Sequence, residues 1–119
     1  MKTQIPKEDQ ESKAFADYLR LKGFKFTHIA NERRTSIQQG VKLKKLGVSP
    51  GVPDFMIILP CLGATHILFI EMKRSKKSLS KVSESQKGWI NAINECTGSM
   101  AGICYGADDA IKIVEYFIK

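Results

Sequence analysis

Residues 51–73 contain the feature that most constrains the fold of this chain. Two apolar runs, Phe55–Leu59 and Ile67–Ile70, are rich in β-branched and aromatic residues, and a connector with proline and glycine separates them. This pattern predicts a β-hairpin with a loop of intermediate length. We expect the two strands to pair antiparallel with Leu59 near Ile67.

Charged side chains occur only at one end of this expected hairpin. Asp54 precedes the first strand, and Glu71 and Lys73 end the second. The expected register places Asp54 beside Met72, and the alternation of strand side chains points Glu71 and Lys73 to the same face. Two half-buried carboxylates repel each other unless a divalent cation such as Mg²⁺ offsets their charge. The alternative is a turn aspartate next to a solvated strand end.

The same residues resemble a known nuclease pattern. Pro53-Asp54 followed by Glu71-Met72-Lys73 is similar to the PD-(D/E)xK superfamily, and GVPDF at 51–55 and SQKGW at 85–89 resemble its VRR-NUC branch. The resemblance is to the small stand-alone members of phages and bacteria, and it covers most of the chain. It implies an αβββαβ core. This agrees with the α/β class that the expected order of helices and strands predicts, with a mixed four-stranded sheet flanked by helices.

The resemblance also implies an activity and a set of site residues. It implies a DNA endonuclease that depends on Mg²⁺ or Mn²⁺, with Asp54, Glu71 and the Met72 backbone carbonyl as metal ligands. Lys73 would position or activate the attacking water, and Gln86 would lie near the active centre. Gln86 has a structural alternative, because Ser83 and Gln86 have the spacing of a helix capping box.

The first expected helix, residues 7–22, carries a third candidate metal ligand. In the nuclease superfamily a glutamate of this helix reaches the metal site, and both Glu8 and Glu11 qualify here. They are separated by one helical turn, and both also complement the positive end of the helix dipole. The sequence therefore leaves Glu8 and Glu11 as alternatives.

Two basic segments flank the candidate site, Asn31–Ser49 and Arg74–Lys81. A formal net charge of +7 favours an anionic partner such as nucleic acid or a membrane surface. Basic runs next to the candidate site indicate phosphate contacts, although such runs are often only solvated loops. A short helix, interrupted or ended near Gly40 or Gly47, is expected in the first segment. The expected DNA-binding residues are Arg33, Arg34, Lys42, Lys44, Lys45, Arg74, Lys76 and Lys77.

The rest of the chain predicts a strand at 24–30, a helix at 83–96, a strand at 100–105 and a final helix from residue 107 or 108. Trp89, Cys96 and Cys104 are expected in the core. The final helix has more apolar surface than one face needs, which suggests a dimer. At 119 residues the chain is expected to be one domain, 1–119. No apolar run is long enough for a membrane span or a secretory signal, so a cytoplasmic location is expected.

These observations lead to one functional hypothesis and two alternatives. The leading hypothesis is a homodimeric, structure-selective endonuclease that cuts four-way (Holliday) DNA junctions, because two symmetry-related sites suit paired cuts. The first alternative is a flap, nicking or other DNA endonuclease of the same superfamily. The second is a DNA-binding module that keeps the fold without catalysis, which the presence of Asp54, Glu71 and Lys73 disfavours.

Overall fold

A computed structural model describes residues 4–29, 36–59 and 66–118 of the chain. The order of elements agrees with the order expected from the sequence, and none of the described helices is long and apolar enough to cross a bilayer. The elements are α1 (Glu8–Lys22), β1 (Lys25–His28), α2 (Ile37–Lys45), β2 (Phe55–Ile58), β3 (Ile67–Lys73), a 3₁₀ turn (Lys77–Leu79), α3 (Glu84–Asn94), β4 (Ser99–Tyr105) and α4 (Ala107–Phe117).

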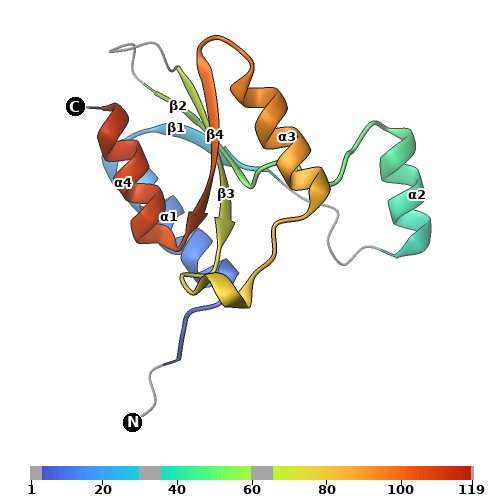
Figure 1. Ribbon diagram of the computed structural model, residues 1–119, viewed down its shortest axis with the longest axis horizontal. Helices are drawn as coiled ribbons and strands as arrows, with labels where there is room; N and C mark the ends of the chain where they lie inside the picture. The colour runs from blue at the N-terminus through green and yellow to red at the C-terminus, as the bar shows by residue number, and fades with distance from the viewer. Residues whose placement is uncertain (1–3, 30–35, 60–65, 119) are drawn as a thin grey trace.

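The strands form one mixed four-stranded sheet in the order β1-β2-β3-β4 (Figure 1). β1, β2 and β3 pair antiparallel, whereas β4 pairs parallel to β3 after the crossover through α3. This arrangement confirms the predicted α/β fold with a mixed sheet flanked by helices. It also brings the start of β2 and the end of β3 to the same end of the sheet.

The register of the β2–β3 hairpin differs by one residue from the predicted register. Ile58, not Leu59, pairs with Ile67. Extending the observed register places Asp54 across from Glu71, whereas the predicted register places it across from Met72. The correction matters because a one-residue slip moves every side chain to the other face of a sheet. The observed register puts the two carboxylates on the same face.

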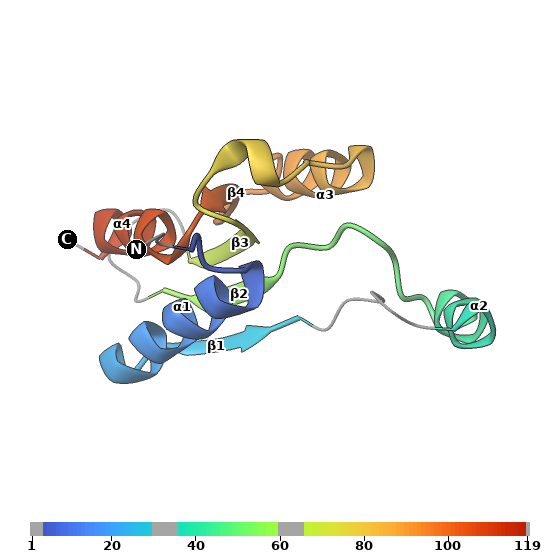
Figure 2. The same ribbon diagram turned by 90° about the horizontal axis from the view of Figure 1, so that it is seen from below.

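The main core lies on the sheet face that α1 and α4 cover. Alternate β3 residues Leu68, Ile70 and Met72 are fully buried there, and Phe15 of α1 and Val114 of α4 pack against them. α1 and α4 lie side by side (Figure 1), whereas α3 lies on the other side of β4 (Figure 2). The odd-numbered β3 residues Glu71 and Lys73 therefore point away from this main core.

α3 covers its part of the sheet only loosely, which corrects two expectations from the sequence. Trp89 is 38% exposed and is not a core residue. Cys96 is exposed, whereas Cys104 is buried as expected. Hydrogen bonds from Asn94 attach the helix to β4: its side chain donates to the carbonyl of Ala101 and accepts from the N–H of the same residue.

α2 stands apart from the rest of the molecule (Figures 1 and 2). Its N-terminus is capped by Ser36, whose hydroxyl accepts from the N–H of Gln39 at 3.1 Å. The helix continues through Gly40 and ends before Gly47, so Gly40 neither interrupts nor ends it. None of its residues is buried. The second basic segment, expected as a plain loop, contains a short 3₁₀ turn.

Candidate active site

Asp54 is fixed at the end of the sheet by backbone groups from two strands. It follows the buried Pro53, and its side chain is 3% exposed. One carboxylate oxygen, Oδ2, accepts a hydrogen bond from the N–H of Met72 in β3 at 2.8 Å. The backbone oxygen of Asp54 accepts from the N–H of Ile29 at 2.6 Å. These contacts hold the carboxylate over the exit of β3.

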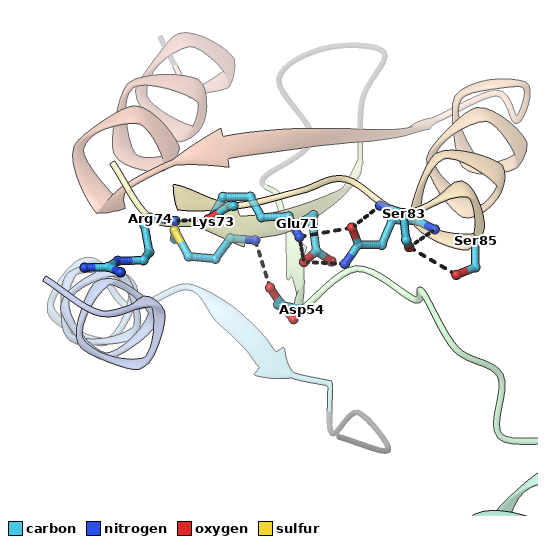
Figure 3. Close-up of polar contacts among 9 residues, drawn as sticks. Asp54, Glu71, Lys73, Arg74, Ser83 and Ser85 are labelled. Carbon is cyan, nitrogen blue, oxygen red and sulfur yellow. Dashed lines mark hydrogen bonds and ion pairs between the residues drawn. The ribbon is translucent and has the colours of Figure 1, made fainter. Parts of the chain in front are cut away.

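Glu71 and Lys73 meet on the same face of β3, as their spacing predicts (Figure 3). Glu71 is fully buried and Lys73 is 4% exposed. The Lys73 ammonium lies 3.6 Å from Oε2 of Glu71. Long charged side chains are seldom buried to this extent without a partner of opposite charge. Their burial at a strand end indicates a functional cluster.

Gln86 performs both roles that the sequence offers for it. Its Oε1 accepts from the N–H of Ser83, and the Ser83 hydroxyl accepts from the N–H of Gln86, which completes the capping box at the start of α3. The same Oε1 accepts from the Lys73 ammonium at 3.0 Å, and Nε2 donates to Glu71 at 3.2 Å. The start of α3 and the polar end of β3 are therefore joined by one amide (Figure 3).

The structure separates the two candidate glutamates of α1. Oxygen atoms of Glu8, Asp54 and Glu71 all lie within 4.8 Å of one another. Glu11 points elsewhere and accepts a hydrogen bond from the N–H of Ala107 at the start of α4, at 3.1 Å. Of the two, Glu8 is the one that joins the acidic cluster, whereas Glu11 caps the last helix.

The acidic cluster holds one carboxyl group whose protonation is strongly perturbed. The pKa of Glu71 is raised from its ordinary 4.5 to about 8. Burial is the largest cause, the negative charge of Asp54 adds to it, and the Lys73 ammonium opposes both. Glu8 contributes a smaller effect in the same direction as Asp54. A further positive charge beside Glu71 would favour its ionised form.

The donor set fits a hard divalent cation. Glu8, Asp54 and Glu71 supply only oxygen atoms, which hard cations prefer. Oxygen atoms that all lie within 4.8 Å of one another are close enough to bind one such ion together. A cation there would also relieve the repulsion that raises the pKa of Glu71.

The backbone carbonyl of Met72 faces the same side of β3 as Asp54. The carbonyl of Lys73 accepts from the N–H of Gly106, on the β4 side of the strand. Successive carbonyls of a strand point to opposite sides, so the Met72 carbonyl points toward Asp54. This is consistent with the role that the family resemblance implies for Met72.

The basic residues expected to bind DNA fall into three places. Lys42, Lys44 and Lys45 are exposed on α2. Lys76 is exposed beside the 3₁₀ turn, and the Lys77 ammonium lies 5.0 Å from the centre of the Tyr105 ring. Arg33 and Arg34 lie outside the described residues. Arg74 contacts backbone carbonyls of the N-terminal segment instead of projecting from the surface.

Gly51 is a site residue that the sequence analysis used only as part of a motif. Its φ of +86° is rarely adopted by residues with a side chain, and a Cβ there would lie 2.5 Å from the backbone carbon of Ser85. The loop before Asp54 therefore packs directly against the start of α3, which carries Gln86. A glycine two residues before Pro53-Asp54 is the only signal in the sequence for this close approach.

The comparisons with known proteins agree with this geometry. The family model of the VRR-NUC domain matches residues 6–108. A solved structure described as a VRR_NUC domain protein is similar to this chain with a TM-score of 0.77 and 26% identity, over 97% of this chain and 90% of that one. A search of curated proteins found no match. The chain therefore belongs to the VRR-NUC family, and its function is of the nuclease type.

Proposed function

We propose that this chain is a metal-dependent, structure-selective DNA endonuclease, formed as one domain over residues 1–119, that resolves four-way junctions as a homodimer. The observation that carries the proposal is the cluster of half-buried Glu8 with buried Asp54 and Glu71, which has the Lys73 ammonium at its edge. Carboxylates around a cation, with a lysine beside them, suit hydrolysis of a phosphodiester.

Glu8, Asp54, Glu71 and the Met72 carbonyl would hold Mg²⁺ or Mn²⁺ in this site. When bound, the ion lowers the pKa of water and stabilises negative charge on the phosphate. The product would carry a 5′ phosphate, as the resemblance to the superfamily implies.

Lys73 supplies the chain's own contribution to the chemistry. An ammonium has three N–H groups; one donates to Gln86 at 3.0 Å, and the charge pairs with Glu71 at 3.6 Å. A remaining N–H group can donate to the attacking water or to a phosphate oxygen, where it offsets developing negative charge. Gln86 fixes the position of the ammonium, because its oxygen accepts from Lys73 at 3.0 Å.

The positive charge of the chain supports DNA as the substrate. The formal net charge is +7 even with all twelve Asp and Glu side chains counted as negative. The exposed lysines of α2 and of the segment after β3 offer phosphate contacts. Such contacts position a substrate without reading its sequence, as expected for an enzyme that selects DNA by shape.

Two exposed apolar surfaces support a homodimer. α2 exposes Ile37 by 88% and Leu46 by 70%. The sheet face opposite the main core exposes Ile58 by 41%, beside the half-buried Ile67. Apolar surface of this kind favours association, and a two-fold pair of sites would suit the paired cuts that a junction requires.

The test is cleavage of a labelled four-way junction beside linear duplex, flap and single-stranded DNA, each with Mg²⁺, Mn²⁺ or EDTA. We expect symmetric cuts at the junction that EDTA abolishes. Asp54→Asn should lower cleavage by about 1000-fold or more, because it removes a charged ligand from the site. Its binding to junction DNA should be equal to or tighter than that of the wild type, because one negative charge is lost.

Asp17→Asn is the matched control for this variant. Asp17 is exposed on α1 and makes only surface ion pairs with Lys13 and Arg20, so the same change of charge should leave cleavage intact. Cutting of flaps or duplex in place of junctions would keep the nuclease and reject the junction substrate. Normal cleavage by Asp54→Asn would reject the site itself, and binding without any cleavage by the wild type would favour an inert DNA-binding module.

A further inference from the structure

Arg74, the residue after the catalytic strand, fastens the N-terminal segment to the sheet. Its Nε donates to the carbonyl of Pro6 at 3.1 Å, and its Nη2 donates to the carbonyl of Ile5 at 2.9 Å. The side chain is half-buried. Two donors of one planar guanidinium thus bind two consecutive carbonyls, a contact with defined geometry. It joins residues 5 and 6 to the exit of β3.

The start of α1 needs an external contact of this kind. Lys7 occupies the N-cap position of α1, and its side chain has no acceptor for the amides of the first turn, although its own N–H donates to Oε1 of Gln10 at 2.8 Å. α2 and α3 instead begin with Ser36 and Ser83, whose hydroxyls accept from those amides. α1 therefore has only one of the two capping contacts that α3 has, and a helix end that is capped less completely frays more readily.

Glu8 is the first residue of α1 and therefore lies in this less completely capped turn. It is also the residue of α1 that joins Asp54 and Glu71 in the acidic cluster. Only one residue, Lys7, separates Glu8 from the carbonyl that Arg74 holds. Movement of the N-terminal segment would therefore displace the Glu8 carboxylate.

We infer that Arg74 is a positioning residue for Glu8, and that it is not a phosphate contact as its place in a basic run suggests. The inference rests on the proposed metal site, and it identifies Arg74 as the residue that orders the Glu8 carboxylate of that site. Guanidinium N–H groups directed at Ile5 and Pro6 carbonyls are not available to DNA. The lysines of the same segment, such as the exposed Lys76, remain the candidates for phosphate binding.

The two roles predict opposite results for Mg²⁺ binding by Arg74→Gln, measured by calorimetry without DNA. Loss of a positive charge near three carboxylates would by itself strengthen cation binding. Loss of a positioning contact should weaken it, and we expect about 10-fold weaker binding. Arg74→Lys keeps the charge but not the paired donors, and should also bind Mg²⁺ more weakly than the wild type.

Hydrogen exchange in metal-free protein gives a second readout that does not depend on the metal site. The amides of Gln10 and Glu11 donate to the Lys7 carbonyl in the first turn of α1. We expect Arg74→Gln to speed their exchange and Lys76→Gln, the matched control, to leave it unchanged. In a Glu8→Gln background, Arg74→Gln should change Mg²⁺ affinity less than 2-fold, because its effect passes through Glu8.

Two results together would overturn the inference: amide exchange that is unchanged in Arg74→Gln, and a slope of log affinity for DNA against log salt that falls by about one unit. They would show that Arg74 contacts a phosphate. Failure of the wild type to bind Mg²⁺ would overturn the proposed metal site instead. In that case the amide exchange still decides whether Arg74 orders the start of α1.

Discussion

The acidic centre and α2 are two regions of the same chain with opposite physical character. In the centre, Asp54, Glu71 and Lys73 are at most 4% exposed, and each contacts a backbone amide, an opposite charge or the amide of Gln86. In α2 no residue is buried. The helix exposes both apolar and basic side chains, and it stands away from the sheet (Figure 2).

This difference indicates what each region can do. Burial makes charges expensive, so a buried cluster is retained only in a fixed geometry and suits the binding of a small ion and the orientation of a reacting group. Exposed lysines form weak, salt-sensitive contacts that suit an extended polyanion. Changes in the centre should therefore alter chemistry and stability, whereas changes in α2 should alter affinity and assembly.

The largest expected effect concerns the stability of the metal-free protein, measured by thermal unfolding in EDTA. The pKa of Glu71 is about 8 in the folded state against an ordinary 4.5, so between these values the folded state keeps a proton that the unfolded state releases. The free energy of unfolding should therefore fall as the pH rises from about 5 to about 8, by a few kcal/mol at most. Saturating Mg²⁺ should stabilise the protein most at the alkaline end.

Glu71→Gln isolates this effect, because the amide cannot ionise. The variant should be more stable than the wild type above about pH 8 in EDTA, and the difference should shrink toward about pH 5. A wild type and variant with parallel pH profiles would mean that Glu71 is not strained by burial. The acidic centre would then not differ from α2 in the energetic cost of its charged groups.

The next largest effect is expected at Gly51, which tests how tightly the centre is packed. An added Cβ would lie 2.5 Å from the backbone of Ser85, so Gly51→Ala should push the start of α3 away and displace Gln86. Misplacement of the amide that orients Lys73 should lower turnover by about 100-fold. The same substitution in a Gln86→Ala background should add little to the loss, which is measured by single-turnover cleavage.

Gly47→Ala is the control next to α2. Gly47 has a similar φ of +94°, but a Cβ there would meet nothing within 4 Å. This variant should lose about 1 kcal/mol of stability from backbone strain and keep normal turnover. Equal losses of turnover in the two variants would show that positive φ alone is responsible, and that the close packing of Gly51 has no role in the site.

Much of the fold could be predicted because the strands have strong local patterns. The apolar runs of β2 and β3 and the capping box of Ser83 and Gln86 are short-range features, and the structure contains all of them. The hairpin register was missed by one residue, because Leu59 continues the apolar run beyond the end of β2. Pattern alone does not mark where pairing stops.

The candidate site was less predictable where it depends on contacts across the fold. Glu8 and Glu11 share one helix face, and only the packing of α4 assigns Glu11 to the Ala107 amide. Arg74 looked like part of a basic run, because a charge count does not distinguish a side chain that binds distant carbonyls from one in solvent. Trp89 looked like core because the sequence does not report how loosely α3 covers the sheet.

The smallest of these effects is expected in α2, and it sharpens the contrast with the centre. Replacing Lys42, Lys44 and Lys45 together with alanine should keep the helix, because alanine is the best helix former. The variant should bind junction DNA about 10-fold more weakly at moderate salt, and the salt dependence of binding should fall by about three units. Turnover at saturating DNA should not change, because none of these lysines lies in the acidic cluster.

The matched control removes the same charge from another part of the surface, at the exposed Lys22, Lys25 and Lys112. If both triple variants lose affinity equally, the binding energy is a property of net charge and α2 has no particular place in the complex. If only the α2 variant loses affinity while its turnover is preserved, binding and chemistry are divided between the two regions. A loss of turnover in the α2 variant would mean that the helix reaches the active centre when DNA is bound, and that its isolation from the sheet belongs to the DNA-free state alone.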